Sequence, residues 1–185
     1  RRVVHTCNEL GMLVDLSHTS PSTMNDALDF AEAPVIWSHA SANGIRAHPR
    51  NVPDQVLRRL PDNGGVVMVT FVPSFVSESD EATLSDVADH IDHVAAIAGI
   101  NHVGIGSDFD GIESTPIGLE DVSTYPSLFA ELSRRGWTEQ DLRKLAGENV
   151  LRVMREAEAV ARRLQRDRPP STATIEQLDG PISDD

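Results

Sequence analysis

The chain has 185 residues, enough for one domain with a hydrophobic core and too few for two domains of ordinary size. Its formal net charge of -13 opposes binding to nucleic acid and to anionic membrane surfaces. Cys7 is the single cysteine, which excludes an intrachain disulfide and a cysteine-rich zinc site. No apolar run reaches the roughly 20 residues of a membrane span, and this pattern favours a cytoplasmic protein without a membrane anchor.

Short apolar runs alternate with helical segments along the chain. Strands are expected at residues 12–16, 35–38, 66–71 and 102–107. Helices are expected at about residues 20–32, 53–60, 84–98 and 126–135, with a further helix after residue 138. Strict alternation of strand and helix predicts an α/β fold with a parallel sheet and helices outside it.

The two ends of the sequence carry different signals. Apolar residues follow helical spacing from Val3 onward, so we expect Arg1 to lie inside a helix whose start is missing. Residues 167–185 combine prolines with several acids and are expected to form a flexible tail. The predicted organisation is therefore a domain at residues 1–166 followed by this tail.

Two of the expected strands are followed by a histidine. His18 follows the first strand and His39 follows the second. Because the carboxyl ends of parallel strands meet at one edge of a sheet, we expect the two imidazoles to lie side by side. Neutral imidazole is a common zinc ligand, and a buried hydrogen-bonded histidine is the alternative for each residue alone. The pair is a candidate metal site.

Asp108 and Arg50 are the candidate catalytic and substrate-binding residues. Gly104 and Gly106 are expected on the same strand face as Asp108, which would leave space there for a substrate or a proton relay. Arg50, in the loop after the second strand, could hold a substrate carboxylate through two hydrogen bonds. The sequence pattern alone does not separate Arg50 from Arg46.

Other polar residues have structural explanations. Asp15 is expected to point away from His18 and to make a structural hydrogen bond. The remaining histidines are expected at the surface or in structural hydrogen bonds: His5, His48, His90, His93 and His102. Of these, His90 and His93 are expected on or beside the solvent-exposed face of the helix at residues 84–98. The sequence contains no nucleophile elbow, phosphate loop, metalloprotease His-Glu-x-x-His or dinucleotide fingerprint.

At these residues the sequence resembles the membrane (renal) dipeptidase family of zinc peptidases. The resemblance runs from Arg1 to about Ala159. Six blocks in order carry it: Leu13-Val-Asp-Leu-Ser-His18, Ser38-His39-Ala-Ser41, Arg50-Asn-Val-Pro-Asp54, Val87-Ala-Asp-His-Ile-Asp-His93, Gly106-Ser-Asp-Phe-Asp-Gly111 and Gly118-Leu-Glu-Asp-Val-Ser123.

The resemblance implies a (β/α)8 TIM-like barrel that hydrolyses dipeptides, including those with a D-residue at the carboxyl end. A complete site would hold two Zn²⁺ ions at the carboxyl ends of the strands. His18 and His39 match the two histidines that bind one of these ions. Arg50 matches the arginine that binds the terminal carboxylate of the dipeptide, and Asp108 matches the acid near the substrate amine and the scissile bond.

The resemblance covers only part of the family pattern. The family's His-x-Asp pair, its bridging glutamate and a further substrate-binding histidine match no stretch of this sequence. We therefore expect the second half of the barrel, with four parallel strand-helix units, to be inactive without its amino-terminal half. Two alternatives stay open: a non-catalytic half-barrel that assembles with a partner chain or as a homo-oligomer, and an amidohydrolase-like enzyme that acts on another amide.

Overall fold

A small parallel sheet lies at the centre of the computed structural model, which describes residues 1–79, 81–167, 172–174 and 177. Its strands are β1 (Ile36–Trp37), β2 (Val66–Val69) and β3 (Val103–Ile105), in the order β1-β2-β3. The register pairs Ile36 with Val66 and Val67 with Val103. The predicted α/β class with a parallel sheet is confirmed.

The prediction of a strand at residues 12–16 is wrong. This segment pairs with β1 only through an isolated parallel bridge between Asp15 and Ile36. The Leu16 amide donates to the Ile36 carbonyl at 2.8 Å. The amide of Ser38, directly after β1, would continue this backbone ladder, but it donates to the Asp15 carboxylate instead. A side chain thus ends the ladder, and the described part of the chain holds three strands and a bridging segment in place of four strand-helix units. The half-barrel stays a prediction.

Nine α-helices surround the sheet in the described part of the chain. In chain order they are α1 (Arg2–Leu10), α2 (Pro21–Phe30), α3 (Asp54–Leu57), α4 (Leu60–Asn63), α5 (Pro73–Val76), α6 (Leu84–Ala98), α7 (Tyr125–Arg134), α8 (Glu139–Arg143) and α9 (Asn149–Asp167). The single helix expected at residues 53–60 is replaced by the short pair α3 and α4, and α5 lies in a segment expected to be a loop.

Side-chain caps mark the helix starts that the sequence predicts best. Ser20 accepts a hydrogen bond from the Thr23 amide in front of α2, with Pro21 at the first helical position. Thr83 and Asp86 form a reciprocal capping box at α6. The same arrangement of Thr138 with its partner three residues later starts α8.

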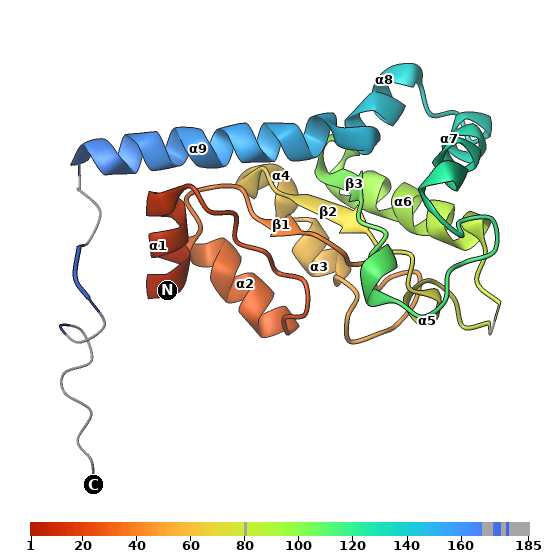
Figure 1. Ribbon diagram of the computed structural model, residues 1–185, viewed down its shortest axis with the longest axis horizontal. Coiled ribbons are helices and arrows are strands. Elements are labelled where there is room, and N and C mark those ends of the chain that lie inside the picture. Colours follow the sequence, from red (N-terminus) through yellow and green to blue (C-terminus); the bar gives the residue numbers. More distant parts are fainter. Residues whose placement is uncertain (80, 168–171, 175–176, 178–185) are drawn as a thin grey trace, which may run out of the picture.

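The hydrophobic core is divided by the sheet. Val35, Trp37 and Val67 belong to the larger buried cluster, which includes apolar side chains of α2, α3 and α6. Ile36 and Val66 belong to a smaller cluster with Val153 of α9. Figure 1 shows α9 along the opposite side of the sheet from α2 and α3. Side chains that alternate along the strands therefore pack into the hydrophobic clusters on both sides of the sheet.

The last helix joins the two ends of the described domain. The Nδ2 atom of the buried Asn149 donates to the carbonyls of Ile100 and Val103, each at 2.8 Å, and fixes α9 at the start of β3. At its other end α9 packs against α1 (Figure 1), where Gln165 donates to the Glu9 carbonyl. The predicted tail at residues 167–185 begins with the last residue of α9 and otherwise lies mainly outside the described residues. Within the described ranges, no helix has the length and apolar character of a membrane span.

Candidate functional site

His18 and His39 meet at the carboxyl edge of the sheet. Their Nε2 atoms are 2.7 Å apart, and their rings are 4.8 Å apart in an edge-to-face arrangement. The prediction that the two imidazoles lie side by side is confirmed. Their role as metal ligands stays a prediction.

Local backbone bends produce this approach. Simple strand alternation would place His39 with Val35 and Trp37, which are fully buried in the larger cluster. Instead the chain bends at Ser38, and His39 is only half-buried. His18 adopts the left-handed φ of 66° and is exposed. Both histidines follow the last regular strand position, so neither continues the side-chain alternation of a strand.

A short chain of hydrogen bonds holds His39 from behind. Oδ1 of Asp15 accepts the amides of Ser17 and Ser38 at 3.0 and 3.1 Å. The Ser38 hydroxyl lies 2.5 Å from Oδ2 of Asp15 and 2.8 Å from Nδ1 of His39. Burial opposes ionisation of Asp15, but the hydrogen bonds from Ser38 and Ser17 outweigh it and lower the pKa of this carboxyl. The structural hydrogen bond predicted for Asp15 is confirmed.

Arg50 and Asp108 lie within electrostatic reach of this pair. Burial lowers the pKa of the Arg50 guanidinium, and Asp108 opposes this shift. Burial also lowers the pKa of His18. The charges of Arg50 and His39 lower this pKa further, whereas Asp108 raises it. The guanidinium carbon of Arg50 lies 5.1 Å from the centre of the Phe75 ring. The Nε of Arg50 is buried and has no hydrogen-bond partner among the described residues, so the guanidinium retains unused donor capacity.

A hollow of about 640 Å³ is lined by His18 of the pair and by Arg50. Its lining includes His18, Asn43, His48 and Arg50. The hollow therefore places a cationic side chain and a candidate metal ligand on the walls of one space. Asp108 is not part of this lining.

The glycines before Asp108 serve close packing, and the prediction of free space beside them is wrong. A Cβ on Gly106 would lie 1.9 Å from the Ser38 carbonyl oxygen, and one on Gly104 would lie 3.1 Å from the Met68 side chain. The space is already filled by β2 and by the end of β1. Asp108 itself has a left-handed φ of 66° and is half-buried.

Two histidines of α6 hold the loop that carries Arg50. Nδ1 of His90 accepts the Ala42 amide at 3.0 Å, and Nε2 therefore donates to the Val76 carbonyl at 3.1 Å. Nε2 of His93 lies 2.8 Å from Oδ1 of Asp54. His90 is fully buried, so its expected place on or beside the wet face is wrong, and burial lowers its pKa to about 4.

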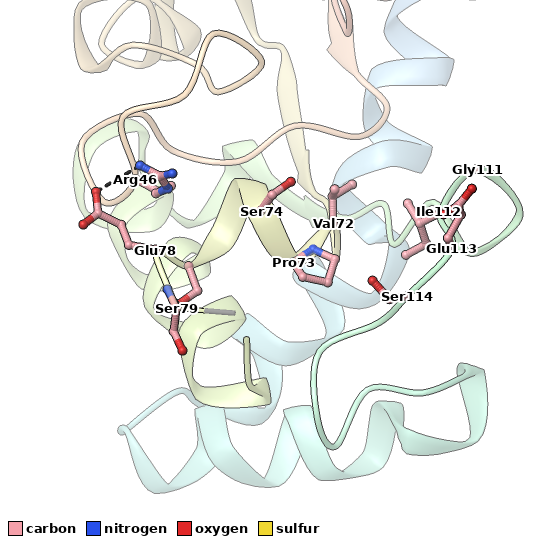
Figure 2. A pocket seen from close by; sticks show the side chains of 11 residues that line it. Arg46, Val72, Pro73, Ser74, Glu78, Ser79, Gly111, Ile112, Glu113 and Ser114 are labelled. Atoms are coloured by element: carbon pink, nitrogen blue, oxygen red, sulfur yellow. Dashed lines mark hydrogen bonds and ion pairs between the residues drawn. The ribbon is translucent and has the colours of Figure 1, made fainter. Parts of the chain in front are cut away.

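Arg46 lines a second hollow, which none of the candidate site residues lines. It has a volume of about 560 Å³ and lies between α5 and residues 111–114. Figure 2 shows Arg46 and Glu78 paired at one side of this hollow and Ile112 with Glu113 at the other. Nη1 of Arg46 lies 2.9 Å from Oε1 of Glu78. Since Arg46 is committed to this ion pair, the structure favours Arg50 as the arginine available to a substrate.

The described residues do not form a complete metal site. No group of three or more histidine, cysteine or acidic side chains in the described ranges could hold a metal ion. His18 and His39 offer two imidazole nitrogens at one point, which fits the nitrogen ligands of zinc. A zinc ion in a protein takes about four ligands, so the other donors must come from outside this set.

The fold and the site define a class of protein: an α/β protein whose polar candidate residues gather at the carboxyl edge of a parallel sheet, where enzymes of this class carry their active sites. The family model of the membrane dipeptidases, peptidase family M19, matches residues 1–168. The chain belongs to this family, as its sequence blocks predict.

Individual relatives agree with this assignment. The "uncharacterized dipeptidase C3A11.10c" of Schizosaccharomyces pombe is 52% identical over 160 residues, which cover 85% of this chain and 39% of the relative. A metallo peptidase from Rhodobacter sphaeroides, crystallised with a phosphinate mimic of the dipeptide L-Ala-D-Ala, is 34% identical with a TM-score of 0.79, over 84% of this chain and 45% of that one.

An amidohydrolase from Pseudomonas aeruginosa is also similar. It is 31% identical with a TM-score of 0.77, and the match covers 84% of this chain and 55% of that structure. The chain thus spans between 39 and 55% of the length of these three relatives.

Proposed function

We propose that this chain carries the carboxyl-terminal part of the active site of a zinc-dependent dipeptidase. The observation that carries the proposal is the pair of Nε2 atoms of His18 and His39, 2.7 Å apart beside a hollow that Arg50 also lines. Membership of the membrane dipeptidase family supports the reaction class. In this proposal the two histidines hold one metal ion, Arg50 binds the substrate carboxylate, and Asp108 takes up a proton and returns it to the leaving amine.

Arg50 is the residue we assign to the terminal carboxylate of the dipeptide. Arg50 lines the hollow, and its buried Nε has no hydrogen-bond partner among the described residues. A planar guanidinium can donate two parallel hydrogen bonds to a carboxylate. The phosphinate mimic of the dipeptide L-Ala-D-Ala in the relative from Rhodobacter sphaeroides supports a substrate with a D-residue at its carboxyl end.

Asp108 is the residue we assign to the substrate amine. The opposing effects of Arg50 and Asp108 on the pKa of His18 indicate that both charges lie near this imidazole. A carboxylate here would accept a hydrogen bond from the amino group of a dipeptide whose other end is held by Arg50. The same carboxylate oxygen could take a proton and return it to the leaving amine.

His18 and His39 are the residues we assign to zinc. When bound, zinc supplies a Lewis acid that polarises the scissile carbonyl and acidifies water. The two imidazoles fit one such ion in part, and the remaining ligands, including any that a second zinc requires, would come from residues outside this chain. The uncovered length of the relatives supports a source in the part of the family pattern that this chain does not span.

Reconstitution tests this function. We expect the purified chain to lack zinc-dependent hydrolysis of L-Ala-D-Ala, and to gain it when the amino-terminal half of a family member is supplied as a second polypeptide. The matched control is the same mixture with His18→Ala and His39→Ala. Hydrolysis by the chain alone, with two tightly held zinc ions, would contradict the proposed incompleteness. Equal hydrolysis with and without the two histidines would contradict the proposed metal site.

A second candidate function has one observation in its favour, the similarity to a structure described as an amidohydrolase. An enzyme of this kind would act on an amide that is not a dipeptide. A panel that compares dipeptides with their N-acetyl and carboxamide forms separates the two functions, because the assigned roles of Arg50 and Asp108 require a free carboxylate and a free amine.

A further inference from the structure

We propose that Asp15 and Ser38 are positioning residues that fix the tautomer of His39, with the ring proton on Nδ1 and the lone pair on Nε2. The consequence for zinc rests on the proposed function, whereas the tautomer itself rests on the hydrogen bonds alone. Because only an unprotonated nitrogen can bind a metal ion, this arrangement would prepare one ligand before the metal arrives.

The chain of hydrogen bonds starts at Asp15, which can only accept when ionised. Its Oδ1 accepts two backbone amides, those of Ser17 and Ser38, and these contacts fix the orientation of the carboxylate. Its Oδ2 lies 2.5 Å from the Ser38 hydroxyl. A serine hydroxyl has one proton, and at this short distance the proton points at the carboxylate.

Ser38 then acts as an acceptor toward His39. Its other close contacts are Nδ1 of His39 at 2.8 Å and the Ser17 hydroxyl at 3.4 Å. Since the only proton of the Ser38 hydroxyl is used at Asp15, Nδ1 of His39 must carry the proton of the 2.8 Å contact. Ser17 also accepts the His39 amide at 3.0 Å, which holds the backbone of the histidine in place.

The contact between the two histidines follows from this assignment. Two ring nitrogens 2.7 Å apart need one proton between them, because two lone pairs would repel each other. With the ring proton of His39 on Nδ1, the proton of this contact belongs to Nε2 of His18. The metal-free pair is therefore asymmetric: Nε2 of His39 already carries a lone pair, and Nε2 of His18 must lose its proton before either nitrogen can bind a metal ion.

The Asp15→Asn variant is designed to reverse the chain of hydrogen bonds. The carbonyl oxygen of the new amide would keep the two backbone donors, and its NH₂ group would replace Oδ2 against Ser38. The Ser38 hydroxyl would then accept from the amide and turn its own proton toward His39, leaving the ring proton on Nε2. Asp110→Asn is the matched control, since it removes the same charge at an exposed aspartate.

Ring nitrogen shifts from long-range ¹H–¹⁵N spectra of the metal-free chain provide the decisive measurement. We expect an Nδ1–H tautomer for His39 in the native chain and in Asp110→Asn, and an Nε2–H tautomer in Asp15→Asn. An Nε2–H tautomer in the native chain, or an unchanged tautomer in a folded Asp15→Asn variant, would overturn the proposal. Should Asp15→Asn fail to fold, Ser38→Ala decides, because loss of the acceptor must move the His39 population toward Nε2–H.

Zinc affinity gives a second readout that does not depend on activity. Calorimetric titration with Zn²⁺ should show about 10- to 100-fold weaker binding for Asp15→Asn than for Asp110→Asn. Equal affinities alongside a reversed tautomer would overturn the proposed consequence for the metal. A native chain with the Nδ1–H tautomer that binds no zinc would keep the tautomer and contradict the zinc assignment of the proposed function, so the two failures are distinguishable.

Discussion

The carbonyl oxygen of Ser38 lies 1.9 Å from the point that a Cβ on Gly106 would occupy. β1 and β3 are not neighbours in the sheet, since β2 lies between them. Their carboxyl ends nevertheless approach each other over Met68, whose Cβ is 2.9 Å from the same point. The segments that follow β1 and β3 therefore converge at the edge that carries His39, and the missing side chain of Gly106 permits this close approach.

The Gly106→Ala substitution tests this close approach. The added methyl group would collide with backbone, which cannot rotate away as a side chain can, so we expect a loss of at least about 3 kcal/mol in the free energy of unfolding. Gly104→Ala is the matched control, because its Cβ would meet the flexible Met68 side chain at 3.1 Å. We expect it to cost about 1 kcal/mol. Urea denaturation of the two variants measures the difference, and equal losses would contradict the argument.

The buried His90 should make the fold sensitive to acid. Its pKa falls from 6.5 to about 4, chiefly because burial disfavours the charged imidazole. The unfolded chain therefore takes up this proton at a higher pH than the folded chain does. The stabilisation from neutral His90 is present above about pH 6.5 and is lost as the pH falls toward 4, by about 3 kcal/mol in total.

Comparison of native protein with His90→Gln isolates this contribution. Glutamine can still donate to the Val76 carbonyl but does not titrate, so the variant should be less stable at pH 7 and should lose less stability between pH 6.5 and 4. The free energy of unfolding, measured by urea titration at several pH values, gives both slopes. Parallel slopes for the two proteins would show that another group accounts for acid sensitivity.

The sequence predicted the elements whose signals are local. The helix starts expected near residues 20 and 84 agree with α2 and α6, where Ser20 and Thr83 cap the first turn, because side-chain caps act within one turn of a helix. The strand after Gly11 could not be excluded, since its end depends on the Asp15 carboxylate capturing the Ser38 amide 23 residues away. That contact is tertiary and leaves no periodic pattern.

The candidate site was predictable in position but not in local geometry. Parallel strand order was enough to bring His18 and His39 together, because it fixes which strand ends share an edge. The left-handed backbone at His18 and Asp108 was not predictable, since non-glycine residues adopt it only where the surrounding fold requires it. The role of His90 in holding the Ala42 amide was missed, because a single polar residue on a helix says little about its burial.

Zinc binding should stabilise the folded chain through the histidine pair. A ligand that binds only the folded state adds about 2.7 kcal/mol at a concentration 100 times its Kd. We expect Zn²⁺ to raise the melting temperature of the native chain, a chelator to reverse this, and His18→Ala with His39→Ala to abolish it. His5→Ala, on α1, is the control that should keep the response. A zinc response that survives in the double variant would place the metal elsewhere.

Arg50→Lys tests the assignment of the substrate carboxylate. Lysine keeps the positive charge but lacks the planar pair of donors, so the variant separates bidentate recognition from simple attraction. In the reconstituted enzyme we expect kcat/KM for L-Ala-D-Ala to fall by about 10- to 100-fold, which corresponds to about 1.4 to 2.7 kcal/mol of transition-state binding. Arg46→Lys is the control, because Arg46 is paired with Glu78 and does not line the hollow next to His18.

The dipeptide carboxamide, which lacks the carboxylate, should be a poor substrate for the native enzyme, and its kcat/KM should fall little further in Arg50→Lys. If the acid and the carboxamide lose activity equally in Arg50→Lys, this arginine supports the loop between Ala47 and Asn51 and does not bind the substrate carboxylate.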